Sequence, residues 1–211
     1  MTQQCYYIGI DMDDRNAVIS YYKAGMREPE TLSTIAGSEI YQIPVALIKK
    51  RGIGQWFIGE EAKRLALLQG EEAVSGLLQA ALAGKEFFIE GETYKAQELL
   101  ALYIKKLVYL AGKLGNPVIP DFLVITLEQL SREVTELFLQ VAERIGIPEG
   151  KLTLIDRRES FIISHSASKK NYGCMMCVCL TTGEMRSGAG DWNGIKEPCR
   201  SLSRSVRNSG I

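Results

Sequence analysis

The chain has 211 residues, enough for one substantial core, and its 46% hydrophobic and 24% charged residues are ordinary for a globular protein. Its 25 basic and 25 acidic residues cancel, so no overall electrostatic field draws the chain to nucleic acid or to anionic lipid. We therefore expect neither nucleic acid nor a membrane among its partners.

The first residues carry no pattern of export or membrane insertion. Residues 1–7 contain neither the basic region nor the apolar run that signal peptides have. No segment approaches the roughly 18 uninterrupted apolar residues of a membrane helix. We expect a cytoplasmic protein.

Up to about residue 95 the sequence predicts short strands and hairpins around one helix. Acidic residues Glu60 and Glu61 suit the positively polarised start of that helix. The predicted elements are strands over 5–10 and 17–22 with a polar bend between them, a third short strand after residue 30, an extended segment fixed by Pro44, a strand over 56–58, the helix from near Glu60, and a hairpin turning at Gly91.

From residue 96 helices and strands alternate. Apolar residues recur every three or four positions from Leu99 to Ala111, which predicts a helix with one buried face. Residues 121–126 form a continuous apolar run, typical of a strand covered on both faces. Ser131 is suited to cap a second helix, after which 151–155 predict a strand and 157–168 a third helix. This alternation predicts a mixed sheet with parallel crossovers, flanked by helices.

Four phrases follow one another on these elements: IGIDMDDRNA, IPVALIKKRGIGQWFIGEEAKRLA, DFLVITLEQLSREVTELFLQVAERIGI and TLIDRRESFIISHSAS. Together, over roughly residues 6–168, they resemble the N-terminal lobe of the Hsp70 chaperone and actin superfamily of ATPases. The first falls where that family has a phosphate loop, Gly-Ile-Asp-Leu-Gly-Thr-Thr-Asn-Ser, and the last where it has Ile-Asn-Glu-Pro-Thr. The resemblance implies an α/β fold, a ribonuclease-H-like lobe of the actin and Hsp70 type.

The resemblance also implies a cofactor at the first bend, ATP or ADP with Mg²⁺. The family's aspartate that matches Asp11 helps to hold the hydrated magnesium, so Asp11 is the candidate metal ligand. Gly9, Asp11 and Asn16 are kept, while the family's Gly-Thr-Thr is replaced. The candidate cofactor-binding residues are Gly9, Asp11, Asp13, Asp14, Arg15 and Asn16.

The replacement at this bend changes its chemistry. Glycine lets backbone N–H groups approach phosphate, and threonine hydroxyls donate to its oxygens. The carboxylates of Asp13 and Asp14 cannot donate and repel those oxygens. A bound cation offsets part of this repulsion, because aspartate oxygens suit magnesium, and Arg15 is a cation that pairs with phosphate.

A second change falls in the last phrase. The family's glutamate in Asn-Glu-Pro-Thr aligns with Arg157, and Glu159 is displaced by two positions. A charge reversal where the family organises water argues against hydrolysis, and no catalytic residue is assigned here.

Residues 171–211 differ in character from the lobe, which we place at 1–170. Periodicity disappears, and serine, arginine, glycine and four of the five cysteines gather in this tail. One hypothesis is an irregular or disordered tail, and another is a shifted reading frame that replaces a second lobe. Read from the third base of each codon, Met175 and Met176 give Asp and Val, and Leu-Trp-Met-His-Asp-Val-Cys-Leu-Phe-Asp is allowed, a strand-like sequence. A third hypothesis is a zinc or iron–sulfur site on Cys174, Cys177, Cys179 and Cys199.

Two functions compete on this evidence. The first is a degenerate lobe that ends before its second lobe and acts as a non-hydrolysing or weakly nucleotide-binding scaffold for other proteins. The alternative is the N-terminal half of an active, ATP-dependent Hsp70-like chaperone. Because the family's cleft lies between two lobes, this chain alone offers half a site, and we expect no productive ATPase activity from it under either hypothesis.

Overall fold

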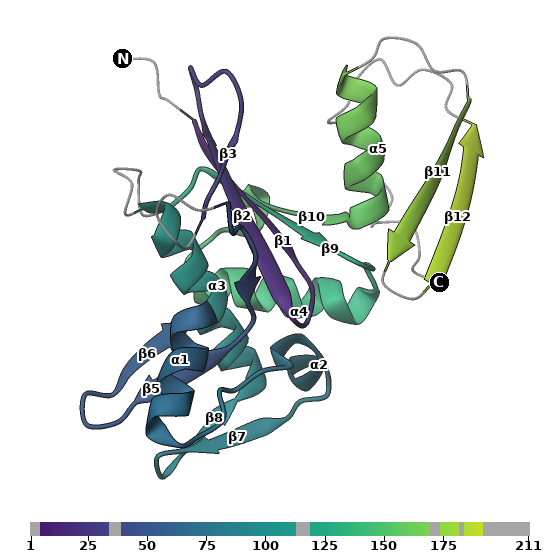
Figure 1. Ribbon diagram of the computed structural model, residues 1–211. Coiled ribbons are helices and arrows are strands. Elements are labelled where there is room, and N and C mark those ends of the chain that lie inside the picture. The colour runs from purple at the N-terminus through teal and green to yellow at the C-terminus, as the bar shows by residue number, and fades with distance from the viewer. Residues whose placement is uncertain (1–4, 34–38, 113–118, 169–173, 182–183, 192–211) are drawn as a thin grey trace. The chain divides into compact units, whose positions relative to one another are not determined.

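The structure, a computed structural model, describes residues 5–33, 39–112, 119–168, 174–181 and 184–191 (Figure 1). For residues 164–168 and for the strands between 174 and 191 it describes the backbone only. The chain divides into two compact units, residues 1–157 and 158–211. Within the described residues, no helix combines the length and the apolar character that crossing a membrane requires.

The first unit is built on a mixed sheet of β1 (Tyr6–Met12), β2 (Asn16–Lys23), β3 (Glu30–Thr31), β4 (Ile43–Pro44), β9 (Phe122–Leu127) and β10 (Leu152–Asp156). Its order is β10-β9-β1-β2-β3, with β4 paired to β2. Strand β1 is antiparallel to β2 and parallel to β9, and β9 is parallel to β10. The prediction of a mixed sheet with parallel crossovers is confirmed.

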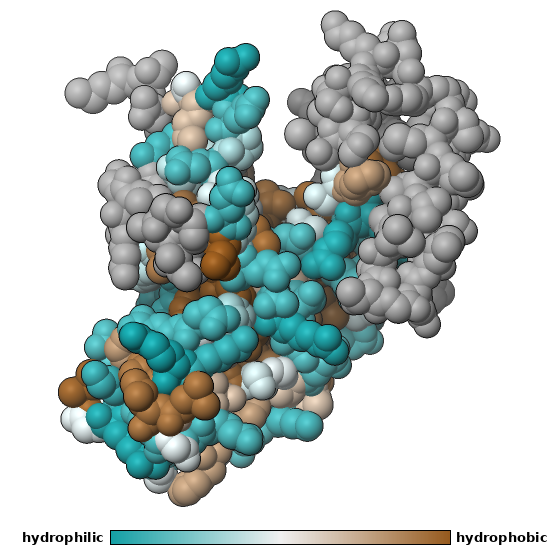
Figure 2. Space-filling view, in the orientation of Figure 1, coloured by the Kyte–Doolittle hydropathy of each residue, from teal (hydrophilic) through white to brown (hydrophobic). Residues whose placement is uncertain are grey.

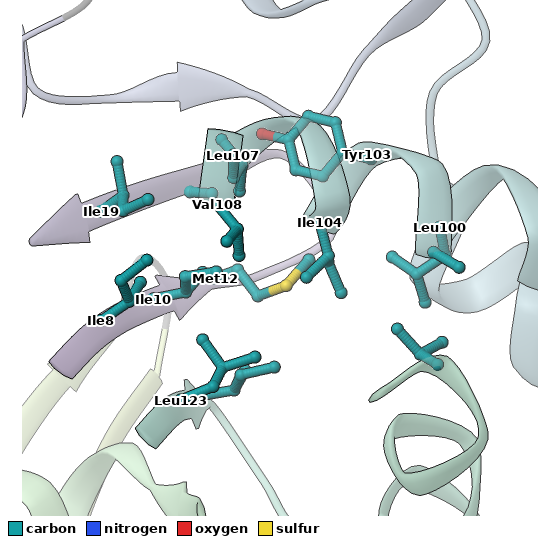
Figure 3. Close-up of a cluster of buried hydrophobic side chains, with 14 of the residues drawn as sticks. Ile8, Ile10, Met12, Ile19, Leu100, Tyr103, Ile104, Leu107, Val108 and Leu123 are labelled. Atoms are coloured by element: carbon teal, nitrogen blue, oxygen red, sulfur yellow. The ribbon is translucent and has the colours of Figure 1, made fainter. Parts of the chain in front are cut away.

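Helices α3 (Ala96–Gly112) and α4 (Arg132–Arg144) form the core with one face of this sheet (Figure 3). Alternate residues of β1 point into that core, and Ile8 and Met12 are 0% exposed. They meet the apolar side of α3, where Ile104 and Leu107 are also fully buried. Each such side chain contributes about 1.5–3 kcal/mol by leaving water, so this face of the sheet stabilises the fold substantially.

The start of α4 follows the sequence prediction. The Ser131 Oγ accepts a hydrogen bond from the Val134 N–H at 3.2 Å, which satisfies one of the free donors of the first turn. The predicted cap is confirmed.

Strand β9 differs from its prediction. Leu123, Ile125 and Leu127 are at most 1% exposed, whereas Phe122 is 38% exposed and the residues between are only half-buried. The strand alternates because helices of the first unit pack on one face of the sheet, and the other face bears partly exposed side chains. A continuous apolar run by itself does not distinguish the two cases.

A smaller part of the first unit contains β5 (Leu47–Lys50), β6 (Gln55–Ile58), α1 (Gly59–Gln69), α2 (Leu77–Leu82), β7 (Glu86–Ile89) and β8 (Glu92–Lys95). The β7–β8 hairpin turns at Gly91, as predicted, with φ +84°. The Lys49 Nζ joins the two hairpins because it donates to the Glu92 Oε2 and to the Tyr94 hydroxyl, both at 3.0 Å. These bonds raise the pKa of Lys49.

A short 3₁₀ turn (Glu149–Lys151) precedes β10, and α5 (Arg157–Ser168) follows it. The second unit contains most of α5 and the strands β11 (Cys174–Thr181) and β12 (Glu184–Asp191), which pair antiparallel. Within the tail, residues 174–181 and 184–191 are the part that the structure describes, and they form this hairpin. The remainder of the predicted tail lies outside the described residues.

Candidate functional site

The predicted site lies at the end of the sheet where three parallel strands finish. In β1, Asp11 pairs with Thr126 of β9, and Thr126 pairs with Ile155 of β10. Arg157 comes two residues after Ile155, at the first position of α5. Ligands of open α/β sheets bind beyond such carboxyl ends, and this edge of the sheet (the carboxyl edge below) is the natural place to look for function.

An ion pair crosses the carboxyl edge between its first and last strands. The Arg157 Nη2 and Nε donate to the same oxygen, Oδ1 of Asp11, at 2.7 Å and 3.1 Å. The two side chains are 35% and 47% exposed, respectively. Partial burial lowers the pKa of Arg157, but the bonds to Asp11 and the negative charges of Asp11, Asp13 and Glu128 outweigh it and raise that pKa.

The second aspartate of the bend closes the bend itself. The Asp13 Oδ1 accepts from the backbone N–H of Arg15 at 2.7 Å and from that of Asn16 at 2.8 Å. The Asp13 N–H in turn donates to the Asn16 carbonyl oxygen at 3.0 Å. Aspartate commonly stabilises turns in this way. The backbone donors on the far side of the bend are therefore bonded to a carboxylate of the same bend.

The third aspartate serves a different element. The Asp14 Oδ1 accepts from the N–H of Leu78 at 2.9 Å and of Gln79 at 3.2 Å, in the first turn of α2. The residue before that helix, Gly76, has φ +64° and offers no side chain to cap it. Asp14 thus supplies the cap from a distant part of the chain, with its charge at the favourable helix end.

The other three predicted residues, Gly9, Arg15 and Asn16, are held by contacts of the β1–β2 hairpin and its neighbours. An added Cβ on Gly9 would lie 3.0 Å from the Ser20 Oγ across the β1–β2 pair, so close packing favours glycine there. The Arg15 carbonyl accepts from the Val45 N–H at 2.7 Å, and its exposed side chain makes no hydrogen bond or ion pair with any described residue. Asn16 begins β2 opposite Pro44.

The six predicted residues are therefore adjacent along the hairpin, but their charged groups diverge. Asp11 faces Arg157, Asp13 faces its own backbone, and Asp14 faces α2. Across the described ranges of the chain, no group of three or more His, Cys, Asp or Glu residues is placed to hold a metal ion. These contacts do not fit a magnesium–phosphate site, because the candidate ligand Asp11 is paired with a guanidinium and the N–H groups of Asp13, Arg15 and Asn16 are already bonded.

Sequence reasoning identified the charge reversal at Arg157 but not its pairing with Asp11. The signal was available, since the carboxyl ends of parallel strands meet at one edge and both residues stand at such ends. The capping role of Asp14 could not be predicted from the sequence, because the short helix that Asp14 caps was not predicted either. The cysteine hypothesis for 174–199 concerns side chains that lie outside the described ones.

Comparison with known proteins gives two findings. The family described as "Family of unknown function (DUF5716) C-terminal" matches residues 28–182. The chaperone protein DnaK of Thermotoga neapolitana is 27% identical over 119 residues, and those of Thermotoga maritima and Thermosipho africanus are 26% identical over the same length. Each match covers 54% of this chain and 19% of the DnaK, so the chain spans about a fifth of these relatives. The similarity to Hsp70 proteins is thus present but distant.

Proposed function

The chain belongs to the DUF5716 C-terminal family, and we propose that it forms a degenerate, ribonuclease-H-like lobe of the Hsp70 and actin type. In this proposal the lobe belongs to a longer protein and acts as a scaffold for other proteins. It hydrolyses no ATP, and it binds ATP or ADP with Mg²⁺ weakly or not at all. The distant similarity to DnaK and the mixed sheet support the lobe.

The hydrogen bonds of Asp13 carry the proposal. A phosphate-binding bend needs free backbone N–H groups that converge on an anion. Here the N–H groups of Arg15 and Asn16 lie 2.7 Å and 2.8 Å from the Asp13 Oδ1. A phosphate would have to displace a carboxylate that already satisfies those donors, and it would meet like charge in doing so.

A scaffold also needs a surface for its partner, and helix α1 offers one. Figure 2 shows apolar surface over the region of α1, where Leu67 is 83% and Leu68 is 76% exposed. Ile53, in the turn between β5 and β6, is 60% exposed. Large apolar side chains gathered on a surface mark contact sites for other proteins.

The alternative function is the N-terminal half of an active ATP-dependent chaperone. The similarity to DnaK favours it, since that similarity spans 119 residues. Under this alternative, the Asp13 carboxylate would have to leave the N–H groups of Arg15 and Asn16 for nucleotide to bind there. The two functions therefore differ in what nucleotide does to the folded protein.

Thermal unfolding of the full chain with ATP and ADP, each with and without MgCl₂, tests the proposal. Ligand at 100 times its Kd stabilises a protein by about 2.7 kcal/mol, which is easily seen as a rise in Tm. We expect no rise with increasing nucleotide and no release of phosphate from ATP. A saturable rise together with phosphate release would support the chaperone instead.

An Asp13→Gly variant sharpens this test. It removes the carboxylate and frees both N–H groups, so the variant should gain stabilisation by pyrophosphate or ATP that the wild type lacks. Asp14→Asn is the matched control, because it also removes one negative charge but leaves the bend closed. A separate experiment tests the scaffold by capturing a partner protein with the wild type. The partner should be lost with the double variant Leu67→Glu/Leu68→Glu and kept with the control Arg132→Gln.

A further inference from the structure

We propose that Arg157 takes the place of a divalent cation beside Asp11, so that this carboxylate is paired without metal and the carboxyl edge takes none up. The inference rests on the proposed function, a lobe that works without hydrolysing nucleotide. It concerns the metal, whereas the argument above concerns the phosphate.

The geometry is that of a cation bound to a single carboxylate oxygen. Both Arg157 donors, Nη2 at 2.7 Å and Nε at 3.1 Å, converge on Oδ1 of Asp11. A metal ion held by Asp11 would need an oxygen of the same carboxylate. The guanidinium, unlike an ion from solution, is attached to the chain and is always charged. Its local concentration at Asp11 therefore does not depend on the medium.

The surrounding charges explain why a cation is needed here. Asp13, in the bend after β1, and Glu128, just after β9, both act on Arg157 as negative charges, in addition to Asp11. Without the guanidinium these three carboxylates would repel one another at the end of the sheet. With it, a second cation arriving from solution meets a positive charge already in place.

The position of Arg157 gives this pairing a structural consequence. Residue 157 is the first of α5 and follows β10 directly, while Asp11 lies in β1, with β9 between the two strands. The ion pair thus joins the residue that follows β10 to β1, across β9. This tie does not depend on any bound ligand.

The test compares thermal unfolding of the full chain in buffer and in millimolar MgCl₂, with ionic strength matched by NaCl. For the wild type we expect no difference between the two salts. Arg157→Gln should lower the Tm by roughly 2–4 °C, and MgCl₂ should restore part of that loss. Arg132→Gln is the matched control, because it breaks the Arg132–Glu136 pair within one exposed helix surface; it should show neither effect.

Two results would overturn the proposal. One is a wild type stabilised by MgCl₂ as much as Arg157→Gln is, since the edge would then accept metal beside the guanidinium. The other is an Arg157→Gln variant with unchanged Tm and no response to MgCl₂. If Arg157→Gln does not fold, the double variant Asp11→Asn/Arg157→Gln, which removes both charges, tests the proposal instead. Folding of the double variant without metal supports the charge pairing, and its failure to fold contradicts it.

The failure of this inference is distinguishable from that of the proposed function. A wild type that responds to MgCl₂ alone but not to ATP contradicts the metal substitution and leaves the non-hydrolysing scaffold intact. A wild type stabilised by ATP without metal, and able to release phosphate, contradicts the scaffold and leaves the role of Arg157 intact.

Discussion

The two sides of strand β1 carry side chains with different tasks. Ile8, Ile10 and Met12 point into the core with α3 and are at most 1% exposed. Gly9 and Asp11 alternate with them, and Asp11 lies at the carboxyl edge beside Arg157. Because successive residues of a strand face opposite ways, the two sets occupy different environments although they share one backbone.

This separation means that residues at the carboxyl edge can change without altering the apolar contacts of the core. The core side of β1 depends on the volume and the apolar contacts of its buried side chains. The aspartates of the bend take no part in those contacts. At the carboxyl edge, each of the three aspartates has a partner within the chain: a guanidinium, a bend or a helix end.

The largest effect should come from the core side, with Phe138→Ala. Phe138 of α4 is 0% exposed, and truncating a buried phenylalanine costs about 3–5 kcal/mol through lost burial and the cavity left behind. Urea unfolding measures the loss. Phe88→Ala is the matched control, because Phe88 in β7 is 77% exposed; equal losses for the two variants would contradict the assignment of the core.

Tyr103→Phe should follow, because it removes a polar group inside the same core. The buried Tyr103 hydroxyl lies 3.2 Å from the Ile43 carbonyl oxygen and 3.1 Å from that of Pro44, and it joins α3 to β4. Leaving buried acceptors without a donor costs roughly 1–3 kcal/mol. The free energy of unfolding in urea measures this, and Tyr109→Phe on the exposed side of α3 serves as its control.

Tyr103 also predicts a dependence on pH that Tyr103→Phe removes. Burial first, and the negative charge of Asp13 second, raise the pKa of Tyr103. A pKa that is higher in the folded state gives stability that is fully present below the ordinary tyrosine value of about 10. That stability is lost as the pH rises through the folded pKa, because the unfolded chain releases the proton first. The wild type should therefore lose stability more steeply above about pH 10 than the variant does; parallel curves would contradict this.

At the carboxyl edge, Asp14→Ala should cost about 0.5–2 kcal/mol, the usual range for a lost helix cap. The amide protons of Leu78 and Gln79 should then exchange faster with solvent, because they lose their acceptor. Asp14→Asn keeps an acceptor oxygen and should cost less. Equal exchange rates in all three proteins would show that Asp14 does not cap α2.

The core side was largely predictable from sequence. The spacing of apolar residues gave α3 and α4, Ser131 gave the start of α4, and Gly91 gave a hairpin turn, because each is a local pattern with a local cause. The mixed sheet followed from the alternation of strands and helices. Local physics and global fold agree in these elements.

The carboxyl edge was predicted only in part, because its contacts are long-range. Asp11 and Arg157 are 146 positions apart, and Asp14 caps a helix 64 positions away. Helix α2 has six residues, and Gly76 before it carries no capping side chain. The residues near its start therefore give no sequence signal for a helix. The sequence could identify Asp11 and Asp14 as candidate site residues and Arg157 as a charge reversal. It could not identify their partners, because those depend on the three-dimensional fold.

The smallest effect should separate the carboxyl-edge ion pair from an ordinary surface pair. A double-mutant cycle over Asp11→Asn and Arg157→Gln should give a coupling of about 0.5–1 kcal/mol, near the upper end for partly exposed pairs. The same cycle over Arg132→Gln and Glu136→Gln, two exposed residues of α4, should give a smaller coupling. The edge pair should also keep more of its coupling in high salt, since its guanidinium is better shielded from solvent, at 35% exposed against 85%. If both couplings vanish equally with salt, the pair at the carboxyl edge is no more than a surface contact, and the division of β1 into a structural and an electrostatic side loses its strongest support.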